Sequence, residues 1–391
     1  MDQPAFLRGL EKEMETVRCT GDCIVSPVGM DSASNYLAVK EGRSELRHYE
    51  SLGHIHTPFV LSRISRDMVD DACRQEHVSV MEYTFFERIA ILAAKGAVRQ
   101  SGIDASSERV LFILSTTKGN VAMLDGEYAH LPESRVMLAE SAKAISGYFG
   151  NPNGPMVVCN ACISGVVAQI QAMRCIESGL YDHVVVVGAD EQSPFIVSGF
   201  LSFKAVSDEP CRPFDRDRKG LNPGECAACM VLSAGDGHGW ELLGGAIRND
   251  ANHISGPSRT GEGSYLALSR ALEGYDISRL AFVNVHGTAT AYNDEMESIA
   301  VSRAGLSDIP LTGYKGYYGH TMGAAGILES IISMYAVNDH TVPATRGFEN
   351  MGVSCPVNVS DVNRHADGNA FVKLLSGFGG CNAAVLYEYQ G

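Results

Sequence analysis

Apolar residues recur at two spacings along the chain, and these spacings predict its elements. Short apolar runs, such as 109–115, 156–159 and 183–188, are typical of buried strands. Longer segments with apolar residues three and four apart, such as 85–100 and 134–148, are typical of helices. Because strands and helices alternate, the pattern predicts an α/β fold with parallel strand pairing.

The same pattern continues through both halves of the chain. Further predicted helices are 4–16, 31–40, 264–273, 293–304 and 322–337. Further predicted strands are 17–24, 227–232, 280–285 and 381–386. The strands 227–232 and 381–386 resemble each other, and each follows a glycine-containing turn. We therefore expect a duplicated architecture that joins near 233–239, with halves at 1–238 and 239–391.

The chain is organised around residues 156–179. The run Met156–Cys159 predicts a strand, and the residues that follow, up to Gly179, predict a helix. Only a tight turn fits between them, so Cys162 stands where a strand passes into a helix. The free N–H groups and the dipole of that helix favour a negative charge, which suits a nucleophilic thiolate. The turn alone is equally compatible with a small apolar cysteine that only fills space.

Composition limits the kinds of partner and location. The chain has 391 residues, of which 45% are hydrophobic, enough for a large core. Its formal net charge is −15, so nucleic acid is not expected as a partner. No run of about 18 apolar residues occurs, so we expect no membrane span. The first 17 residues carry acidic groups among the apolar ones and lack the apolar core of a signal peptide.

The cysteines favour reduced thiols. There are 11, an odd number, and several lie in apolar runs. A cytoplasmic location is therefore expected. The pairs Cys159/Cys162 and Cys226/Cys229 have the spacing of zinc ligands, but more than 60 residues separate them, which is long for a zinc ribbon. We expect no metal.

Three further stretches have unusual composition. His286 follows a predicted strand in a loop of small residues, and Lys315 and His320 precede a helix rich in glycine and alanine. The segment 376–380 is a glycine-rich turn in which backbone N–H groups can approach a ligand closely. Each stretch alone has an ordinary structural explanation. Together with Cys162, they indicate an active site.

These motifs resemble those of the elongating β-ketoacyl-[acyl carrier protein] synthases, of the thiolase fold, over most of the chain. Residues 160–165 resemble the nucleophile motif, which more often begins with Thr. Residues 286–297 resemble the first histidine motif, and 315–329 resemble the lysine and second histidine motif. The loop 211–225 resembles another family loop. Two histidines separate the chain from relatives with Cys-His-Asn or Cys-His-Cys sets.

The resemblance implies a duplicated five-layer αβαβα fold, with the nucleophile in the first half and both histidines in the second. It implies that Cys162 carries the acyl group as a thioester and attacks with the help of an oxyanion hole. His286 and His320 donate N–H groups to the enolate that forms when malonyl loses CO2. Lys315 tunes this set electrostatically, and Glu329 helps to hold the network.

The resemblance also implies a second set of roles at the glycine-rich turn and the first histidine loop. The backbone N–H of Phe378 joins that of Cys162 in the oxyanion hole, and the Phe378 side chain is an acyl gate. The implied substrate-binding residues are Thr288, Thr290, Ser376, Gly377 and Gly379. No metal or organic cofactor is required.

Some residues depart from the family pattern. Ser376 and Cys381 stand where the family usually has Phe and Thr, and Cys226 stands where it has Gly. The loop 115–119, Ser-Thr-Thr-Lys-Gly, replaces a more glycine-rich one. Because Ser376 is much smaller than Phe, we expect a looser gate and bulkier or more rigid acyl groups, which leaves room for polyene or polyketide synthesis beside fatty-acid elongation.

The resemblance implies partners as well. Acyl and malonyl groups arrive on acyl carrier protein, through its phosphopantetheine arm. We expect a homodimer that pairs through 156–159, with a heterodimer as a variant. Two other functions stay open: an inactive chain-length partner, which would lack the nucleophile, and a cysteine hydrolase, which needs no second histidine or lysine.

Overall fold

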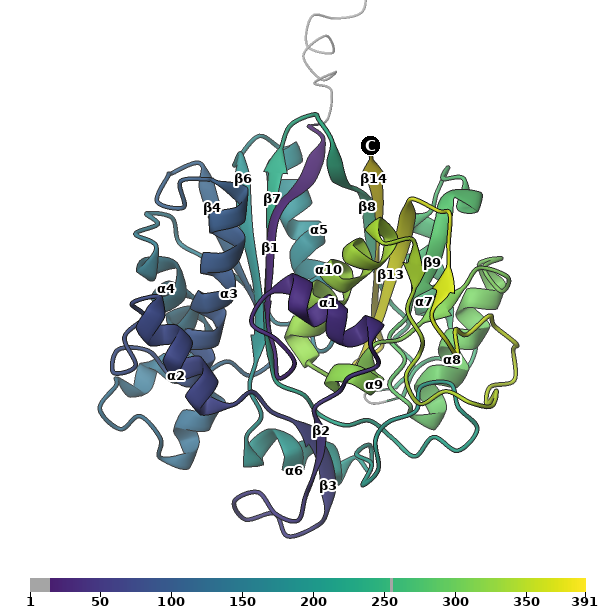
Figure 1. The fold of residues 1–391 in the computed structure, drawn as a ribbon, viewed down its shortest axis with the longest axis horizontal. Helices are drawn as coiled ribbons and strands as arrows, with labels where there is room; N and C mark the ends of the chain where they lie inside the picture. The colour runs from purple at the N-terminus through teal and green to yellow at the C-terminus, as the bar shows by residue number, and fades with distance from the viewer. Residues whose placement is uncertain (1–14, 254–255) are drawn as a thin grey trace, which may run out of the picture.

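The protein is described from a computed structural model, which covers residues 15–253 and 256–391 (Figure 1). The predicted helix 4–16 lies almost entirely outside these residues. Within them, ten strands form one sheet in the order β10-β9-β13-β14-β8-β1-β7-β6-β4-β5. Its strands are β1 Val17–Val25, β4 Val110–Ser115, β5 Met156–Val158, β6 His183–Asp190, β7 Cys226–Ala234, β8 Gly239–Asn249, β9 Leu280–Asn284, β10 Leu311–Thr312, β13 Ala370–Gly377 and β14 Cys381–Gln390.

The sheet consists of two halves with the same strand order. In the first half, β5, β4, β6, β7 and β1 follow one another, and in the second half β10, β9, β13, β14 and β8 do so. The halves meet where β1 pairs with β8 over two residue pairs, Arg18 with Glu241 and Cys19 with Trp240. The similar segments 227–232 and 381–386 fall in β7 and β14, which hold the same place in their halves.

Helices cover both faces of each half-sheet and complete five layers. Helix α5 (Ser164–Glu177) packs against α10 (Ala325–Asn338) in the middle layer, between the two half-sheets (Figure 1). Helices α3 (Phe85–Ser101) and α4 (Leu138–Tyr148) cover the outer face of the first half, and α7 (Glu262–Ala271) covers that of the second. The remaining helices are α1 Ser32–Lys40, α2 Arg66–Gln75, α6 Pro194–Ser202, α8 Ala291–Arg303 and α9 Lys315–Tyr318.

Parallel pairing holds, as predicted, among β5, β4 and β6 and among β10, β9 and β13, but the pairs made by β7 and β14 and the β1–β8 pair are antiparallel. Strands β7 and β14 are antiparallel to both of their neighbours. In the second half the reason is local, because β13 passes into β14 through the turn 378–380, and so short a connection can join only antiparallel strands.

The predicted helix 134–148 is interrupted, since Glu133–Val136 is a 3-10 turn and α4 begins at Leu138.

Several elements were not predicted from the sequence. Besides α2, α6 and α9, these are β10 and the short strands β2 Leu46–Tyr49, β3 Phe59–Ser62, β11 Thr341–Val342 and β12 Arg364–His365. Their apolar stretches are short or interrupted by polar residues, so no clear period marks them. Strand β8 was also missed, because two glycines interrupt it.

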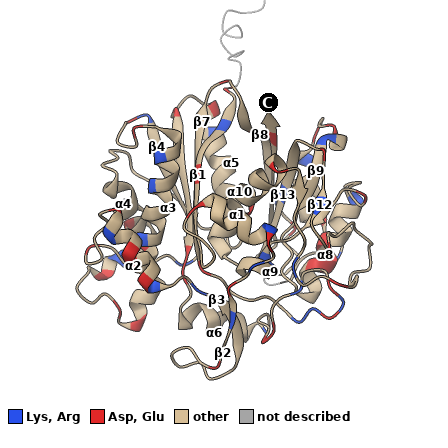
Figure 2. Cartoon of the chain, viewed as in Figure 1, with Lys and Arg blue, Asp and Glu red and all other residues tan. Residues whose placement is uncertain are grey.

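The apolar side chains form three large clusters, one in the middle layer and one beneath each outer layer of helices. Charged residues lie mostly on the outer helices and loops (Figure 2). No helix among the described residues combines the length and the apolarity needed to cross a membrane. All 11 cysteines lie in the described part of the chain, and none is in a disulfide.

Candidate active site

Cys162 lies in the turn between β5 and α5, where the sequence places it. Ala161 has a left-handed φ of 45°, which is uncommon for a residue other than glycine and makes the turn sharp. The Ser164 hydroxyl donates to the carbonyl of Ala161 (2.6 Å) and accepts from the N–H of Asn160 (2.7 Å). These bonds hold Cys162 at the start of α5 with 7% of its surface exposed.

Glycines let the start of α10 approach the start of α5. A Cβ on Gly326 would lie 2.5 Å from the backbone N of Val166, and a Cβ on Gly165 would lie 3.0 Å from the carbonyl of Gly323. No larger residue fits at Gly326 without a shift of the backbone. The small-residue segment that the sequence showed after His320 therefore serves to bring the His320 loop up to Cys162.

Backbone bonds on both sides hold His320. Its N–H donates to the carbonyl of Asn222 (2.6 Å), and its carbonyl accepts from the N–H of Gly224 (3.0 Å). The family-like loop 211–225 thus supports this histidine. The N–H of Met322 donates to Nδ1 of His320 (3.3 Å). Since Nδ1 accepts, the neutral imidazole carries its proton on Nε2, which is buried and has no partner among the described residues.

His286 follows β9, and a carboxylate from α8 fixes its loop. Glu297 accepts hydrogen bonds from the backbone N–H groups of His286 (2.6 Å) and Gly287 (2.7 Å), and from the Asn293 side chain (2.8 Å). Burial, followed by the charge of Asp294, raises the pKa of Glu297 to about 7. Nδ1 of His286 is buried without a partner in the described chain.

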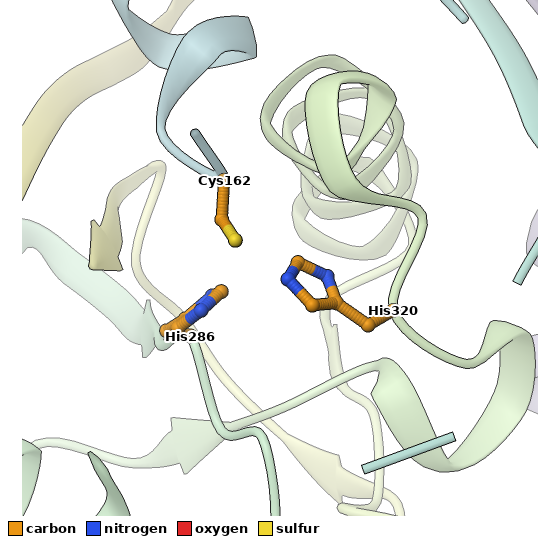
Figure 3. Close-up of side chains that lie close together, drawn as sticks. All are labelled: Cys162, His286 and His320. Atoms are coloured by element: carbon orange, nitrogen blue, oxygen red, sulfur yellow. The ribbon is translucent and has the colours of Figure 1, made fainter. Parts of the chain in front are cut away.

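The structure brings the cysteine and both histidines together. The Cys162 sulfur and one nitrogen of each histidine lie within 4.8 Å of one another, and Figure 3 shows the three side chains facing one common space. The two imidazole rings meet edge to face, with centroids 5.0 Å apart and planes at 80°. Residues from β5, β9 and the segment before α10 thus converge on one point.

Two buried lysines lie behind the histidines. Nζ of Lys315 donates to one oxygen of Glu329 (2.8 Å), and Nζ of Lys373 donates to the other oxygen (2.5 Å) and to the carbonyl of Val285 (3.0 Å). Lys373 was not predicted from the sequence, although a lysine in the otherwise apolar run 370–375 was a usable signal. Burial lowers the pKa of Lys373 to about 8, and Glu329 opposes this shift.

These surroundings keep the imidazoles neutral. Burial, followed by the charge of Lys315, lowers the pKa of both His286 and His320 well below the usual value. Burial raises the pKa of Cys162 to about 12, against the effect of Lys315. This direction is opposite to that which a helix N-terminus favours, and burial is its largest cause. The resting set is a neutral thiol with two neutral imidazoles.

One cysteine and two histidines also form a possible ligand set for zinc. The field of Lys315 and Lys373, which disfavours protonated histidine, disfavours a metal cation in the same place. That field instead favours an anion, such as a thiolate or an enolate.

The turn 378–380 packs beside the nucleophile. A Cβ on Gly377 would lie 3.2 Å from the backbone N of Cys162. At the base of the turn, the Ser376 hydroxyl bonds to Asn382 Oδ1 (2.9 Å) and lies 3.0 Å from the hydroxyl of Ser264. Ser376 therefore does not leave an empty space in place of the family's Phe; it belongs to a buried polar network that the sequence did not predict.

A cavity of about 580 Å³ opens beyond this turn. Its lining consists of Phe195, Phe200, Phe203, Phe378, Ile196, Gly199, Ser198, His54, Lys118 and Asp125. The centroid of the Phe378 ring lies 5.2 Å from that of Phe203 and 6.0 Å from that of Phe200. The Phe200 ring in turn packs edge to face against His320, with centroids 6.4 Å apart. Phe378 and Phe200 thus both line this apolar cavity, and Phe200 connects it to His320.

The two threonines expected to bind substrate lie on the His286 loop. Their hydroxyls, Oγ1 of Thr288 and Oγ1 of Thr290, are 2.8 Å apart. Ala289 between them has a left-handed φ of 60°. The two side chains are therefore held side by side near His286.

Comparisons with known proteins give matches over most of the chain. The family model described as "Beta-ketoacyl synthase, N-terminal domain" matches residues 14–237, and "Beta-ketoacyl synthase, C-terminal domain" matches 240–349. The chain is 28% identical to 3-oxoacyl-[acyl-carrier-protein] synthase 2 of Vibrio cholerae, covering 94% of this chain and 98% of that protein. It is 30% identical to the tetracenomycin polyketide synthase ketoacyl synthase alpha subunit of Streptomyces glaucescens, covering 94% and 95%.

Solved structures of similar fold include two-chain complexes. A chain from the complex of the ketosynthase ApeO with its chain length factor ApeC, from Xenorhabdus doucetiae, has a TM-score of 0.86 at 22% identity, covering 100% of both chains. A chain of the ishigamide ketosynthase/chain length factor has a TM-score of 0.84 at 26% identity, covering 97% of this chain and 100% of that chain.

Proposed function

The chain belongs to the beta-ketoacyl synthase family, and from that premise we propose how its own residues carry out condensation. Family members are acyl-transferring condensing enzymes, and this chain is one of them. The observation that carries the assignment of residues is the meeting of Cys162, His286 and His320 within 4.8 Å, in front of two buried lysines.

The first step transfers an acyl group to the enzyme. The Cys162 sulfur attacks the carbonyl carbon of an acyl-[acyl carrier protein] thioester, and the bond from that carbon to the pantetheine sulfur breaks. The proton of the Cys162 thiol passes to the departing sulfur, so the carrier protein leaves with a free thiol. The backbone N–H groups of Cys162 and Phe378 stabilise the oxyanion, which in other enzymes contributes about 3–4 kcal/mol per donor.

The second step forms the carbon–carbon bond. Malonyl-[acyl carrier protein] loses CO2, and the electron pair of the broken bond gives an enolate. Nε2–H of His320 and an N–H of His286 donate to the enolate oxygen. The enolate carbon then attacks the acyl carbonyl, the bond to Cys162 breaks, and the thiolate takes a proton from solvent.

Neutral imidazoles suit this role. A protonated histidine would have to lose its charge again in each cycle, whereas a neutral one donates without changing its charge. Lys315 and Lys373 keep both histidines neutral and add a positive field toward the enolate. Thr288 and Thr290 bind the pantetheine arm, and Ser376, Gly377 and Gly379 shape the passage for the acyl chain.

We propose that the catalytic residues are divided between the two halves of the protein. We assign the nucleophile to a half that spans 1–238 and both histidines to a half that spans 239–391. The repeated strand order supports this division. Acyl carrier protein is the partner that delivers both substrates, and two copies of the chain pair through the edge strand β5.

Mass spectrometry tests the function. Wild-type enzyme incubated with acyl- and malonyl-[acyl carrier protein] should give a 3-oxoacyl product, and without the malonyl carrier it should give an acyl group on Cys162. Cys162→Ala should give neither, whereas Cys159→Ala, which removes the exposed neighbouring thiol, should give both. An acyl label on Cys159 or Cys226 in the wild type would contradict the assignment.

The two other functions predict different results in the same experiment. An inactive chain-length partner would give no acyl-enzyme, and a cysteine hydrolase would release free acid from the acyl carrier without malonyl. The presence of all three side chains in one cluster argues against both.

A further inference from the structure

The loop 115–119, which departs from the family pattern, has no part in the steps above. It follows β4 and contacts a fully buried carboxylate, Asp190, at the end of β6. Oδ1 of Asp190 accepts from the hydroxyls of Thr116 (2.9 Å) and Thr117 (3.2 Å) and from the N–H of Lys118 (3.3 Å). The N–H of Thr117 also donates to Oδ1 (3.1 Å) and to Oδ2 (3.2 Å). The loop therefore fixes the Asp190 carboxylate, mainly through Oδ1.

The other oxygen binds the His320 loop. Oδ2 of Asp190 accepts from the N–H of Gly323 (2.6 Å), and the Ser115 hydroxyl donates to the carbonyl of the same glycine (2.7 Å). A Cβ on Gly323 would lie 2.7 Å from Cα of Thr116 and 2.8 Å from Oδ2 of Asp190. Both polar backbone groups of Gly323 are thus held by side chains from the other half of the protein.

Gly323 is next to the residue that orients the imidazole. Met322 has a left-handed φ of 46°, and its N–H donates to Nδ1 of His320. If the peptide of Gly323 moved, this N–H would move with it, and the tautomer and ring position of His320 would no longer be set.

We propose that Asp190 is a positioning residue, which with Ser115 clamps Gly323 and thereby holds His320 with its proton on Nε2, pointing at the substrate. The role of Asp190 in catalysis rests on the proposed function, but the effect of Asp190 on the tautomer and position of His320 does not. The loop 115–119 is the support of this clamp.

A role in packing alone does not account for a carboxylate here. A buried charge costs free energy that an apolar residue would avoid. All partners of Asp190 present N–H or O–H groups, and an ionised carboxylate is the side chain that only accepts. Burial raises its pKa to about 6, against the effect of these donors.

The test compares two variants by a readout that needs no turnover. The side chain of Asn carries one acceptor oxygen and one donor NH2 group. In Asp190→Asn, the NH2 group must face either the N–H of Gly323 or the donors of the loop 115–119, so the hydrogen bonds on that side are lost. Ser115→Ala removes the bond to the Gly323 carbonyl and is the milder change. Nitrogen-15 NMR of the imidazoles reports the tautomer of each histidine. Wild-type His320 should be the Nε2–H form, and both variants should show a mixture of tautomers.

Kinetics give the second readout. In Asp190→Asn, CO2 release from malonyl-[acyl carrier protein] should fall by about 100-fold, since a displacement of about 1 Å has an effect of that order. Acylation of Cys162 should change by less than about threefold, because acylation does not use His320. Glu388→Gln, which alters a buried carboxylate bound to Tyr275 and Arg279, is the control and should leave both rates unchanged.

An unchanged His320 spectrum in Asp190→Asn would overturn the proposal. An equal loss of acylation and CO2 release in Asp190→Asn would also overturn it, because equal losses indicate general damage to the protein. If Asp190→Asn does not fold, the spectrum of Ser115→Ala decides in the same way. If the wild type shows no condensation, the proposed function fails, but the NMR result still tests the clamp.

Discussion

Burial dominates the chemistry of Cys162. Its sulfur lies at a helix N-terminus, yet its pKa is raised to about 12 because the side chain is buried. We therefore expect the Cys162 thiol to react slowly with small reagents at neutral pH.

This pKa predicts a steep pH dependence of alkylation. Below its pKa, the thiolate fraction of Cys162 rises tenfold for each pH unit, so the iodoacetamide rate should rise about 100-fold from pH 7 to 9 without a plateau. Peptide mass spectrometry separates Cys162 from exposed Cys159. Free glutathione is the control, and its rate should level off above about pH 8.5–9. A plateau for Cys162 near pH 7 would show that it rests as a thiolate.

The histidines should serve decarboxylation more than acylation. His286→Ala and His320→Ala each remove a donor to the enolate, so CO2 release from malonyl-[acyl carrier protein] should fall by about 100-fold or more. Acylation of Cys162 should persist in both. The measurements are CO2 release and the mass of the acyl-enzyme. Normal CO2 release by both variants would contradict the role.

At the scale of elements, the turn between β13 and β14 is the part best placed to move. It holds Phe378, which is 36% exposed, between two glycines, and glycine permits backbone changes that other residues do not. Its carbonyls accept bonds from the side chains of Asn249 and Asn382, and Ser376 anchors its base. Because these side chains hold the carbonyls of Gly379 and Gly380, we expect the Phe378 side chain to be the part of the turn that moves.

Substitution of Ser376 tests what sets the gate. Ser376→Phe should lower acylation by polyunsaturated relative to saturated acyl carriers, because a second aromatic ring narrows the passage. It should also lower the unfolding free energy by about 1–3 kcal/mol through overpacking.

Ser376→Ala is the matched control, since it breaks the bonds to Ser264 and Asn382 without filling space. It should keep the wild-type ratio of acylation rates while lowering the melting temperature. If Ser376→Phe leaves that ratio unchanged, Ser376 does not set the gate.

At the scale of the molecule, β5 is the edge strand of the sheet formed by the described residues. Among residues 15–253 and 256–391 it pairs only with β4, and its Met156 and Val157 are half-buried. An open apolar edge beside the nucleophile invites pairing with a second copy.

Light scattering at micromolar concentration should give about twice the 41.9 kDa mass of one chain. Val157→Lys should shift the protein toward the monomer, because a charge at the edge opposes strand pairing. Leu180→Lys, which adds the same charge at an exposed position away from β5, is the control and should stay dimeric. A monomer in the wild type would overturn the prediction of a homodimer.

The order of residues was enough to predict the α/β class, most long elements and the chemical groups of the site. Strand and helix periods are local, and Cys162, His286, Lys315 and His320 stand in short motifs whose residue types reveal their chemistry. The similarity of 227–232 and 381–386 also pointed to two halves, and the two segments do occupy equivalent strands.

What the order of residues could not decide depends on contacts between distant segments. The raised pKa of Cys162, the pairing of Lys373 with Glu329, the network around Ser376 and the clamp of Asp190 on Gly323 all join residues from different elements. Burial and hydrogen bonding act over a few ångströms in space, whatever the separation along the chain. Only the folded structure brings those groups within that range, and so it alone decided the protonation state and the orientation of the catalytic side chains.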